Sequence, residues 1–389
     1  MDNHQIKIRK IRLKNLDEFA QNALTNPAFQ NIAPISLVRA HSQTKNPHAE
    51  PDDITLLVAL CDNRCVGYHG LLPGFLKIDD NYSKVYWLVT FYLDAGFRGQ
   101  GHGKHLVTEI QNTAVDLVTT GITASAERVY RSTGFKALGE LPYYQLRLEK
   151  LRFMHSHFQY LGIKSHKPGK FGLFLNWLGG WSYLMTKQIV YSIVFQKLKA
   201  KKNIFKSKSV NRLDEELKSI ITQQSPFASF HRDIDTINWM LRHPWVVSRL
   251  ESKKDFQNYY FSQVRDLFKL VALEIYAPDG KTRKGYLILS LSRKKNESVV
   301  KILDYNLFEP QDAFIAGYFG IKYAKDLLAD RIEYPESLNS FFEEQPFLKR
   351  LIKKKKRLYL FYSKTNDSPL TVSVGKIKLD YCDGDTAFT

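Results

Sequence analysis

Residues 97–106 read FRGQGHGKHL, a glycine-rich turn followed by a basic, helix-forming stretch. Glycine is costly inside regular structure and is favoured where the backbone turns tightly or lets a ligand approach closely. The preceding residues, KVYWLVTFYL, are rich in β-branched and aromatic side chains and predict a strand. The sequence therefore predicts a strand, a glycine turn and a helix N-terminus in succession. The exposed backbone N–H groups of such an arrangement can bind an anion.

Two familiar phosphate-binding loops do not fit this stretch. A Walker A loop requires glycine at the position of Arg98. A dinucleotide-binding Gly-x-Gly-x-x-Gly motif requires glycine where Lys104 or Leu106 stands. The pattern that is present is Arg-x-x-Gly-x-Gly, made by Arg98, Gly101 and Gly103.

The first 150 residues alternate strand and helix signals around this loop. The residues that recur at helical spacing after the loop are Leu106, Ile110, Ala114 and Leu117. In chain order, the predicted elements are a strand at 6–13, a helix at 17–24, a hairpin turning at 61–64, the strand at 84–93, a helix at 104–118, a strand at 122–125, a helix at 126–134 and a strand at 143–151.

A chain of 389 residues is too long for one ordinary core and suggests two domains. Residues 151–210 are aromatic and apolar and end in a basic stretch, which indicates a connector arm. From residue 211 a second pattern of hairpin, strand, helix and strand begins, like a distant duplication of the first. We therefore expect a domain at 1–150, an arm at 151–210 and a second domain at 211–389.

The Arg-x-x-Gly-x-Gly loop resembles the pyrophosphate loop of the GNAT superfamily of acyl-CoA-dependent N-acyltransferases. About thirty residues further on, ERVYRSTGFKALG resembles the second signature of that family, a short helix with Tyr130 before Gly134 and Phe135. The resemblance covers roughly residues 5–150. It implies an α/β fold with a mixed sheet and two GNAT-like domains. The second domain is degenerate, because no such loop follows its candidate central strand, and it is expected to form a wall of the acceptor site.

The resemblance implies an acyl-CoA co-substrate, expected to be acetyl-CoA. The backbone of Tyr92 and Leu93 would bind the pantetheine arm. The pyrophosphate would lie among loop residues whose N–H groups and helix dipole favour an anion: Arg98, Gly99, Gly101, His102, Gly103 and Lys104. The family often has Asn about seven residues before the signature tyrosine, where this chain has Thr123. Either the Thr123 hydroxyl or that of Ser125 would then contact the pantetheine arm.

Acyl transfer from a thioester to an amine needs a neutral amine, a polarised carbonyl and a proton for the departing thiolate. By the resemblance, a backbone N–H of the strand before the loop polarises the carbonyl and Tyr130 protonates the thiolate. The alternative for Tyr130 is a buried tyrosine that packs against the loop. His69 is the candidate base if its side chain faces the acyl group, and otherwise a core histidine. Asp94 is expected to cap a turn, Asp233 to cap a helix, and His231 to lie at the surface.

The 57 Lys and Arg residues outnumber the 39 Asp and Glu residues, and the net charge of +18 favours acidic partners. Three cysteines provide neither a disulfide framework nor a zinc site, so no metal is expected. The N-terminus lacks the apolar core of a secretory signal. The apolar run at 171–195 is interrupted by Asn176 and Lys187 and is poor for a spanning helix. We therefore expect a cytoplasmic protein.

The expected function is N-acylation of a small-molecule amine. The favoured acceptor is a nucleotide-linked amino sugar, because bacterial GNAT proteins with a degenerate second domain resemble those of surface-polysaccharide pathways. One alternative is a Fem-type aminoacyl transferase of cell-wall precursors, against which the intact acyl-CoA loop argues. The other is a non-catalytic basic module that binds nucleic acid or a membrane. No recognised nucleic-acid motif accompanies the lysine runs, so no nucleic-acid partner is expected.

The apolar and basic arm at 171–208 has two interpretations. It packs between the domains, or it makes a peripheral contact with a membrane, its lysines facing anionic lipid. Packing is favoured, because the run mixes aromatic residues with glycines and shows no clean amphipathic period.

Overall fold

The structure of the protein is a computed structural model. It describes residues 6–114, 116–152, 170–198, 205–218, 221, 228–249, 259–261, 264–295, 297–307, 313–344 and 346–386. The chain divides into two compact units. Unit 1 comprises Met1–Leu141, Asn211–Arg265 and Lys356–Thr389, and unit 2 comprises Pro142–Val210 and Asp266–Lys355.

These units differ from the consecutive domains expected at 1–150 and 211–389, because the chain passes between them several times. Two strands, β6 (Lys136–Arg147) and β15 (Ile352–Ser363), each begin in one unit and end in the other. The last residues of β15 pair with a strand of unit 1, and the last residues of β6 pair with a strand of unit 2. Strand signals are local, so the sequence does not reveal which unit a strand joins.

Unit 1 contains a mixed sheet whose strands follow one another in the order β1-β2-β3-β4-β5-β15. Their bounds are Lys7–Arg12 (β1), Ile54–Cys61 (β2), Arg64–Ile78 (β3), Asn81–Leu93 (β4) and Asp116–Thr120 (β5). The pair β4–β5 is parallel and the other neighbouring pairs are antiparallel. The short β8 (Ala228–Phe230) pairs with β3, and β9 (Val247–Ser248) pairs with β10 (Val264–Arg265).

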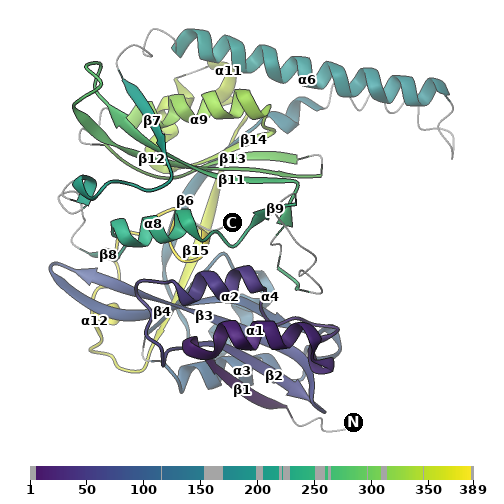
Figure 1. Ribbon diagram of the computed structural model, residues 1–389, viewed down its shortest axis with the longest axis vertical. Coiled ribbons are helices and arrows are strands. Elements are labelled where there is room, and N and C mark those ends of the chain that lie inside the picture. The colour runs from purple at the N-terminus through teal and green to yellow at the C-terminus, as the bar shows by residue number, and fades with distance from the viewer. Residues whose placement is uncertain are drawn as a thin grey trace. The chain divides into compact units, whose positions relative to one another are not determined.

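Helices cover both faces of this sheet (Figure 1). On one face, α1 (Leu16–Thr25) and α2 (Leu37–Thr44) pack on a core that includes Leu56 and Val58. On the other, α3 (His102–Gln111) and α4 (Ala124–Ser132) pack on a core that includes Leu57. These alternating residues of β2 serve opposite faces because side chains of a strand have a period of two. The described residues of unit 1 also form α8 (Ile234–Arg242) and α12 (Pro369–Val372).

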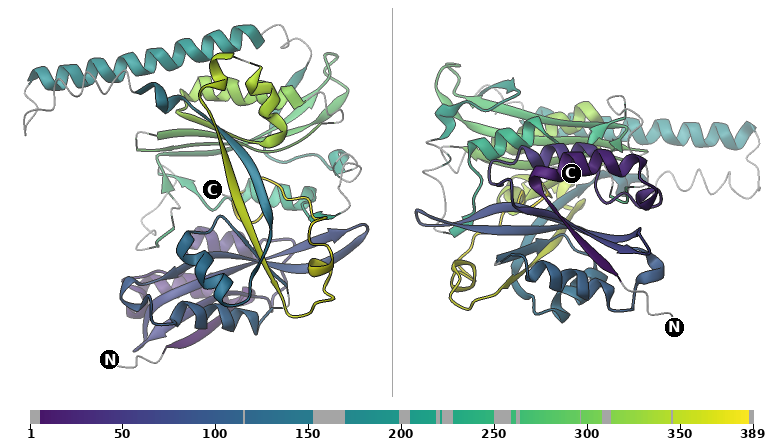
Figure 2. Two further views of the ribbon diagram at one scale, coloured as in Figure 1. Left: turned by 180° about the vertical axis from the view of Figure 1, so that it is seen from behind. Right: turned by 60° about the horizontal axis from the view of Figure 1, so that its bottom comes forward.

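Unit 2 has a sheet with the strand order β6-β14-β13-β12-β11-β7. The bounds are Arg331–Pro335 (β14), Glu297–Leu307 (β13), Arg283–Lys294 (β12), Leu267–Tyr276 (β11) and Lys206–Val210 (β7). The helices in the part of unit 2 that the structure describes include α6 (Lys170–Leu198), α9 (Phe314–Leu327), α10 (Asn339–Glu343) and α11 (Pro346–Lys349). The long α6 packs along α9, as Figure 2 shows from two further sides. Within the described residues, no helix is long and apolar enough to cross a membrane.

Two predicted elements after the glycine loop are wrong. The helix expected over 104–118 ends at Gln111, because Asp116–Thr120 instead form β5 and pair in parallel with β4. Leu117 is buried in that strand, so its helical spacing from Leu106 was coincidental. The strand expected at 122–125 is the start of α4, whose N-cap Thr123 accepts a hydrogen bond from Ala126 N at 3.3 Å.

Candidate active site

The central strand β4 carries a bulge just before the glycine loop. Tyr68 of β3 pairs with Tyr92, and Gly70 pairs with Val89, so Thr90 and Phe91 both stand opposite a single residue of β3. Thr90 has a φ of +51°, which is unusual for a β-branched residue. Backbone held in a rare conformation clusters at binding and catalytic sites.

The strand also separates from its parallel neighbour at this place. The last β4–β5 pair within the described residues joins Leu88 to Thr119. The five residues from Val89 to Leu93 therefore keep β3 as their described strand neighbour, and the opposite edge of β4 is available to a ligand. This is the splayed strand that the family resemblance implies.

The loop that follows contains glycines whose backbone conformation requires them. Gly99 and Gly101 have φ angles of +79° and +85°, in the left-handed region where a side chain is strained. A Cβ atom at either position would meet no atom within 4 Å, so both glycines border open space. Arg98 ties the loop back to the strand, because its Nε donates a hydrogen bond to the Leu93 carbonyl at 2.9 Å. As expected, Asp94 caps the turn by accepting from Gly96 N at 3.0 Å.

A cavity of about 640 Å³ lies beside these features. Its volume is in the range of pockets that enclose a small-molecule ligand. It is lined by Phe91, Tyr92, Leu93, Arg98, Gly99, Gly101, Gly103, Lys104, Thr123, Ser125, Ala126, Arg128, Val129, Ser132, Tyr260 and Phe261. The end of β4, the loop, the first turn of α3 and one face of α4 thus surround a single space within unit 1.

The structure brings most of the predicted cofactor residues to this cavity. Tyr92, Leu93, Arg98, Gly99, Gly101, Gly103, Lys104 and Ser125 line it, whereas His102 is absent from its lining. The hydroxyls of Thr123 and Ser125 are 2.9 Å apart, so the two residues proposed for one contact lie together. Sequence reasoning missed Arg128 and Ser132, which follow Ser125 at helical spacing on α4. It also missed Tyr260 and Phe261, for which the sequence offers no signal because they come from a distant segment.

The two predicted catalytic residues, Tyr130 and His69, are hydrogen-bonded to each other. The Tyr130 hydroxyl lies 2.8 Å from His69 Nε2, and His69 Nδ1 lies 3.1 Å from the Gly70 carbonyl. A carbonyl can only accept, so Nδ1 carries the proton. Burial lowers the pKa of His69 to about 4, so the ring is neutral near neutral pH and Nε2 accepts from the Tyr130 hydroxyl. Burial also raises the pKa of Tyr130.

Both side chains of this pair are buried, with exposed fractions of 1% for Tyr130 and 0% for His69. Neither lines the cavity. The ring of Phe91 does, and it stacks on His69 with ring centroids 4.8 Å apart and lies 5.8 Å from the Tyr130 ring. Phe91 thus connects the cavity wall to the buried pair.

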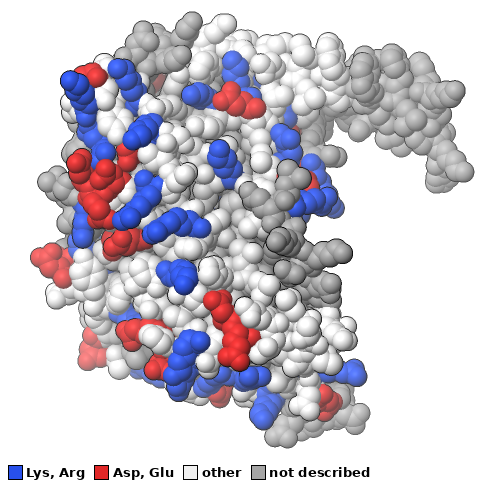
Figure 3. Space-filling view, viewed as in Figure 1, with Lys and Arg blue, Asp and Glu red and all other residues white. Residues whose placement is uncertain are grey.

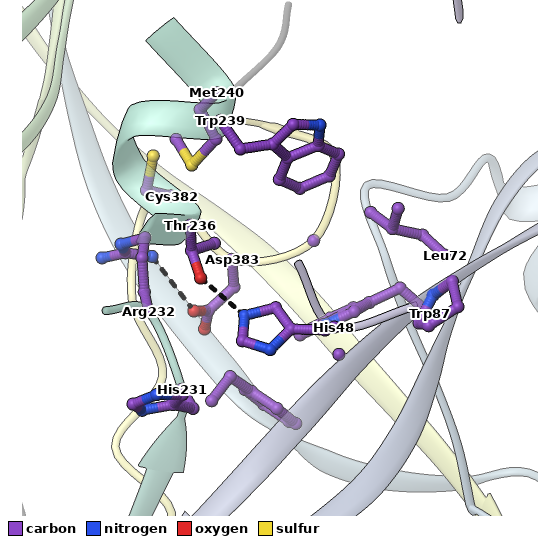
Figure 4. A pocket seen from close by; sticks show the side chains of 14 residues that line it. His48, Leu72, Trp87, His231, Arg232, Thr236, Trp239, Met240, Cys382 and Asp383 are labelled. Carbon is purple, nitrogen blue, oxygen red and sulfur yellow. Dashed lines mark hydrogen bonds and ion pairs between the residues drawn. The ribbon is translucent and has the colours of Figure 1, made fainter. Parts of the chain in front are cut away.

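A second pocket in unit 1 is much smaller, about 50 Å³ (Figure 4). The Thr236 hydroxyl at its wall donates its proton to Asp233 Oδ1, so His48 Nε2 donates to the Thr236 oxygen across 2.5 Å. Burial lowers the pKa of His48 to about 4. Arg232 forms ion pairs with Asp380 at 3.0 Å and with Asp383 at 3.7 Å. A space of this size holds a few water molecules and is too small for an acylated substrate. The larger cavity is therefore the candidate active site.

Two sequence predictions concern the neighbourhood of the smaller pocket. Asp233 caps α8 as predicted, because it accepts a hydrogen bond from Thr236 N at 2.8 Å. His231, predicted to lie at the surface, is partly buried, and its Nε2 lies 3.5 Å from Asp233 Oδ2. Within the described residues, no group of three or more metal-ligating side chains gathers in one place.

Comparison with known proteins gives one family match. Residues 22–135 match the model of the Acetyltransferase (GNAT) family. No curated protein matches the sequence. The matched segment contains the bulge of β4, the glycine loop and Tyr130, and it ends at Phe135 of the second signature.

Solved structures with a similar arrangement include three acyltransferases. N-myristoyltransferase of Saccharomyces cerevisiae with bound myristoyl-CoA has a TM-score of 0.50 at 9% identity, over 93% of this chain and 81% of that one. A GCN5-related N-acetyltransferase from Anabaena variabilis has a TM-score of 0.49 at 12% identity, over 92% of this chain and 72% of that one. A putative acetyltransferase from Pyrococcus horikoshii has a TM-score of 0.43 at 13% identity, over 99% of both chains.

At such low identity, the likeness to the yeast structure concerns the fold alone. It agrees with the mixed α/β fold that the resemblance implied, and that prediction is confirmed. The loop, the splayed strand and the signature tyrosine all lie inside residues 22–135, the segment that is similar to the GNAT acetyltransferase family.

Proposed function

We propose that the protein is an acyl-CoA-dependent N-acyltransferase and that acyl-CoA binds in the cavity of about 640 Å³. One observation carries the proposal: two left-handed glycines and the N-terminus of α3 border open space at the end of a splayed strand. Glycine at these two positions keeps the space free of side chains, so the backbone N–H groups beside it can approach an anion closely. The GNAT family match over the same residues supports it.

In this proposal, the CoA pyrophosphate binds over the loop. The backbone N–H groups at Gly99, Gly101 and the start of α3 donate to it, and the helix dipole adds a favourable field. Lys104 and Arg128 line the cavity and supply positive charge. The pantetheine arm lies along the free edge of β4 at Tyr92 and Leu93, and the Ser125 hydroxyl contacts it.

The reaction follows from the positions around the bulge of β4. The neutral amine of the acceptor attacks the thioester carbonyl, and a backbone N–H of the splayed strand stabilises the negative charge on the carbonyl oxygen. The C–N bond forms, the C–S bond breaks, and the thiolate of CoA takes a proton from Tyr130. The acylated nitrogen releases its extra proton to water, and Tyr130 regains a proton from water to complete the cycle. His69 is then a positioning residue, because its Nε2 holds the Tyr130 hydroxyl. Proton delivery requires the Phe91 side chain to shift, since Phe91 and not Tyr130 lines the cavity.

The acyl group is proposed to be acetyl, and the acceptor a nucleotide-linked amino sugar of surface-polysaccharide synthesis. The net charge of +18 supports the acceptor, because positive clefts raise association rates of ligands that carry a diphosphate. The yeast structure contains myristoyl-CoA, so donors with longer chains belong in the same experiment.

The test has a binding arm and a turnover arm. Calorimetric titration with acetyl-CoA, myristoyl-CoA and free CoA should show saturable binding. The affinities of the three ligands should differ according to the acyl chain that each carries. Release of CoA thiol is then followed with a panel of nucleotide-linked amino sugars, polyamines and amino acids. Turnover with polyamines or amino acids alone contradicts the proposal that the acceptor is an amino sugar. If no CoA species binds, the proposed acyltransferase function itself is wrong.

A further inference from the structure

Helix α6 of unit 2 buries one of its two faces. Tyr191 and Val194 belong to the core of unit 2 together with residues of α9. Lys187, the charged residue on this face, is buried and forms an ion pair with Asp330 at 3.1 Å. Its Nζ also donates to the Leu328 carbonyl. This side of α6 is therefore an ordinary packed face with a satisfied buried charge.

The opposite face of α6 exposes large apolar side chains at helical spacing. They are Trp181, Leu184, Met185, Ile189 and Ile193, with exposed fractions of 55%, 45%, 42%, 53% and 52%. Positions 181, 185, 189 and 193 follow one another every four residues, so they form one stripe along the helix. The exposed or half-buried polar residues between them, Ser182, Thr186, Gln188 and Ser192, are uncharged. The described part of α6 is largely white in Figure 3, which colours charged residues.

A surface helix normally turns charged and polar residues to water. Contiguous exposed apolar patches of this kind mark a contact with another molecule or with a membrane. The packed face and the exposed face together make α6 apolar all round, and such a helix needs cover on both sides. The described residues provide cover on the α9 side.

The charge of the surrounding sequence distinguishes between the occupants. From Lys150 to Leu213 the chain has thirteen Lys and Arg residues and no Asp or Glu. A second copy of this chain docked face to face would bring two such segments together, and their like charges would repel. An anionic lipid surface attracts them, while its interface accepts Trp, Leu and Ile side chains.

We propose that the exposed face of α6, formed by Trp181, Leu184, Met185, Ile189 and Ile193, binds the surface of an anionic membrane. The helix lies in the interface with this face toward the acyl chains. Basic residues of the flanking sequence contact the lipid phosphates, except Lys187, which is buried against Asp330. This inference does not depend on the proposed acyltransferase function. One face of α6 packs on α9, and the membrane contact that the sequence left open then belongs to the opposite face of the same helix.

The experiment is co-sedimentation of the full-length protein with vesicles. Vesicles of phosphatidylglycerol and phosphatidylcholine should pellet the protein, and vesicles of phosphatidylcholine alone should not. The double variant Ile189→Glu/Ile193→Glu should weaken binding roughly tenfold or more, because two charges enter the apolar stripe. Raising the salt concentration should release the parent protein.

The matched control is Val372→Glu/Val374→Glu, which alters two exposed apolar residues of unit 1 with exposed fractions of 61% and 39%. It should bind anionic vesicles like the parent. Equal binding of the parent to neutral vesicles, or equal loss in the control, overturns the proposal. A lipid-free dimer that the Ile189→Glu/Ile193→Glu variant dissociates also overturns it, since the face would then be an interface between copies. All variants should bind acyl-CoA equally, which separates this result from that of the proposed function.

Discussion

Units 1 and 2 share a strand pattern but differ in the use of their glycines. In unit 1, β4 is parallel to β5, and β5 is antiparallel to β15. In unit 2, β13 is parallel to β14, and β14 is antiparallel to β6. Each parallel pair is joined by a connection that contains a helix, α3 in unit 1 and α9 in unit 2.

The glycines next to these two helices have opposite surroundings. A Cβ atom at Gly99 or Gly101 would meet open space beside the cavity. A Cβ atom at Gly317 of α9 would collide with the ring of Phe341, and one at Gly320 would come within 2.7 Å of Ile302. Glycine therefore lets a ligand approach in unit 1 and lets a helix approach its core in unit 2. That only the first domain binds acyl-CoA stays a prediction.

The largest effect is expected from Gly101→Glu. A bulky acid at this left-handed position would fill the space for the pyrophosphate and repel it, so acyl-CoA binding should be lost. The measurement is calorimetric titration with acetyl-CoA. The control is Gly375→Glu, whose glycine has a φ of +83° and borders open space but does not line the cavity. Equal affinity of Gly101→Glu and the control for acetyl-CoA would contradict the proposed acyl-CoA site.

A second large effect concerns turnover. Tyr130→Phe removes the hydroxyl that we propose protonates the thiolate, so kcat should fall about a hundredfold while acyl-CoA affinity stays nearly unchanged. His69→Gln keeps a hydrogen-bond partner and should lower kcat less. Its acid limb in the pH–rate profile should differ from that of the parent, whereas a purely packing role would leave the profile unchanged. Unaltered kcat in Tyr130→Phe would return this residue to the packing alternative.

Gly317→Leu tests the packing role in unit 2. The added side chain meets Phe341, so the free energy of unfolding of unit 2 should fall by about 1–3 kcal/mol. Hydrogen exchange followed by mass spectrometry should show reduced protection of the backbone amides in α9 and β13. Acyl-CoA affinity should remain that of the parent. A loss of affinity equal to that of Gly101→Glu would break the distinction between the two sets of glycines.

The smallest effect is a pH dependence confined to unit 1. Burial lowers the pKa of His48 and of His69 from 6.5 to about 4. Between these values the unfolded chain binds more protons than the folded one, so stability is present above pH 6.5 and is lost as the pH falls toward 4. The described residues of unit 2 include no histidine. As the pH falls through this range, urea unfolding and hydrogen exchange should therefore show that the free energy of unfolding decreases in unit 1 before unit 2. His48→Gln should reduce the slope, and an unchanged slope would contradict the assignment.

Part of the site could be predicted because its signals are local. The left-handed turn before α3 needs glycine whatever surrounds it, so FRGQGHG indicated the loop without a structure. Asp94 and Asp233 cap their elements through backbone N–H groups two or three residues away, and both caps were predicted. The type of the following elements was less certain: residues 116–120 became a strand because β4 offered a parallel partner.

Other features depend on residues far apart in the chain. Tyr260 and Phe261 reach the cavity, and β6 and β15 run from one unit into the other, through contacts that leave no local pattern. The sequence named Tyr130 and His69 separately, but only the tertiary structure placed one hydroxyl 2.8 Å from one ring nitrogen and buried both. Local sequence signals thus indicated where the backbone turns and where a helix begins, because φ angles and caps depend on neighbouring residues. The tertiary structure decided which side chains share a space, because burial and long-range packing set that choice.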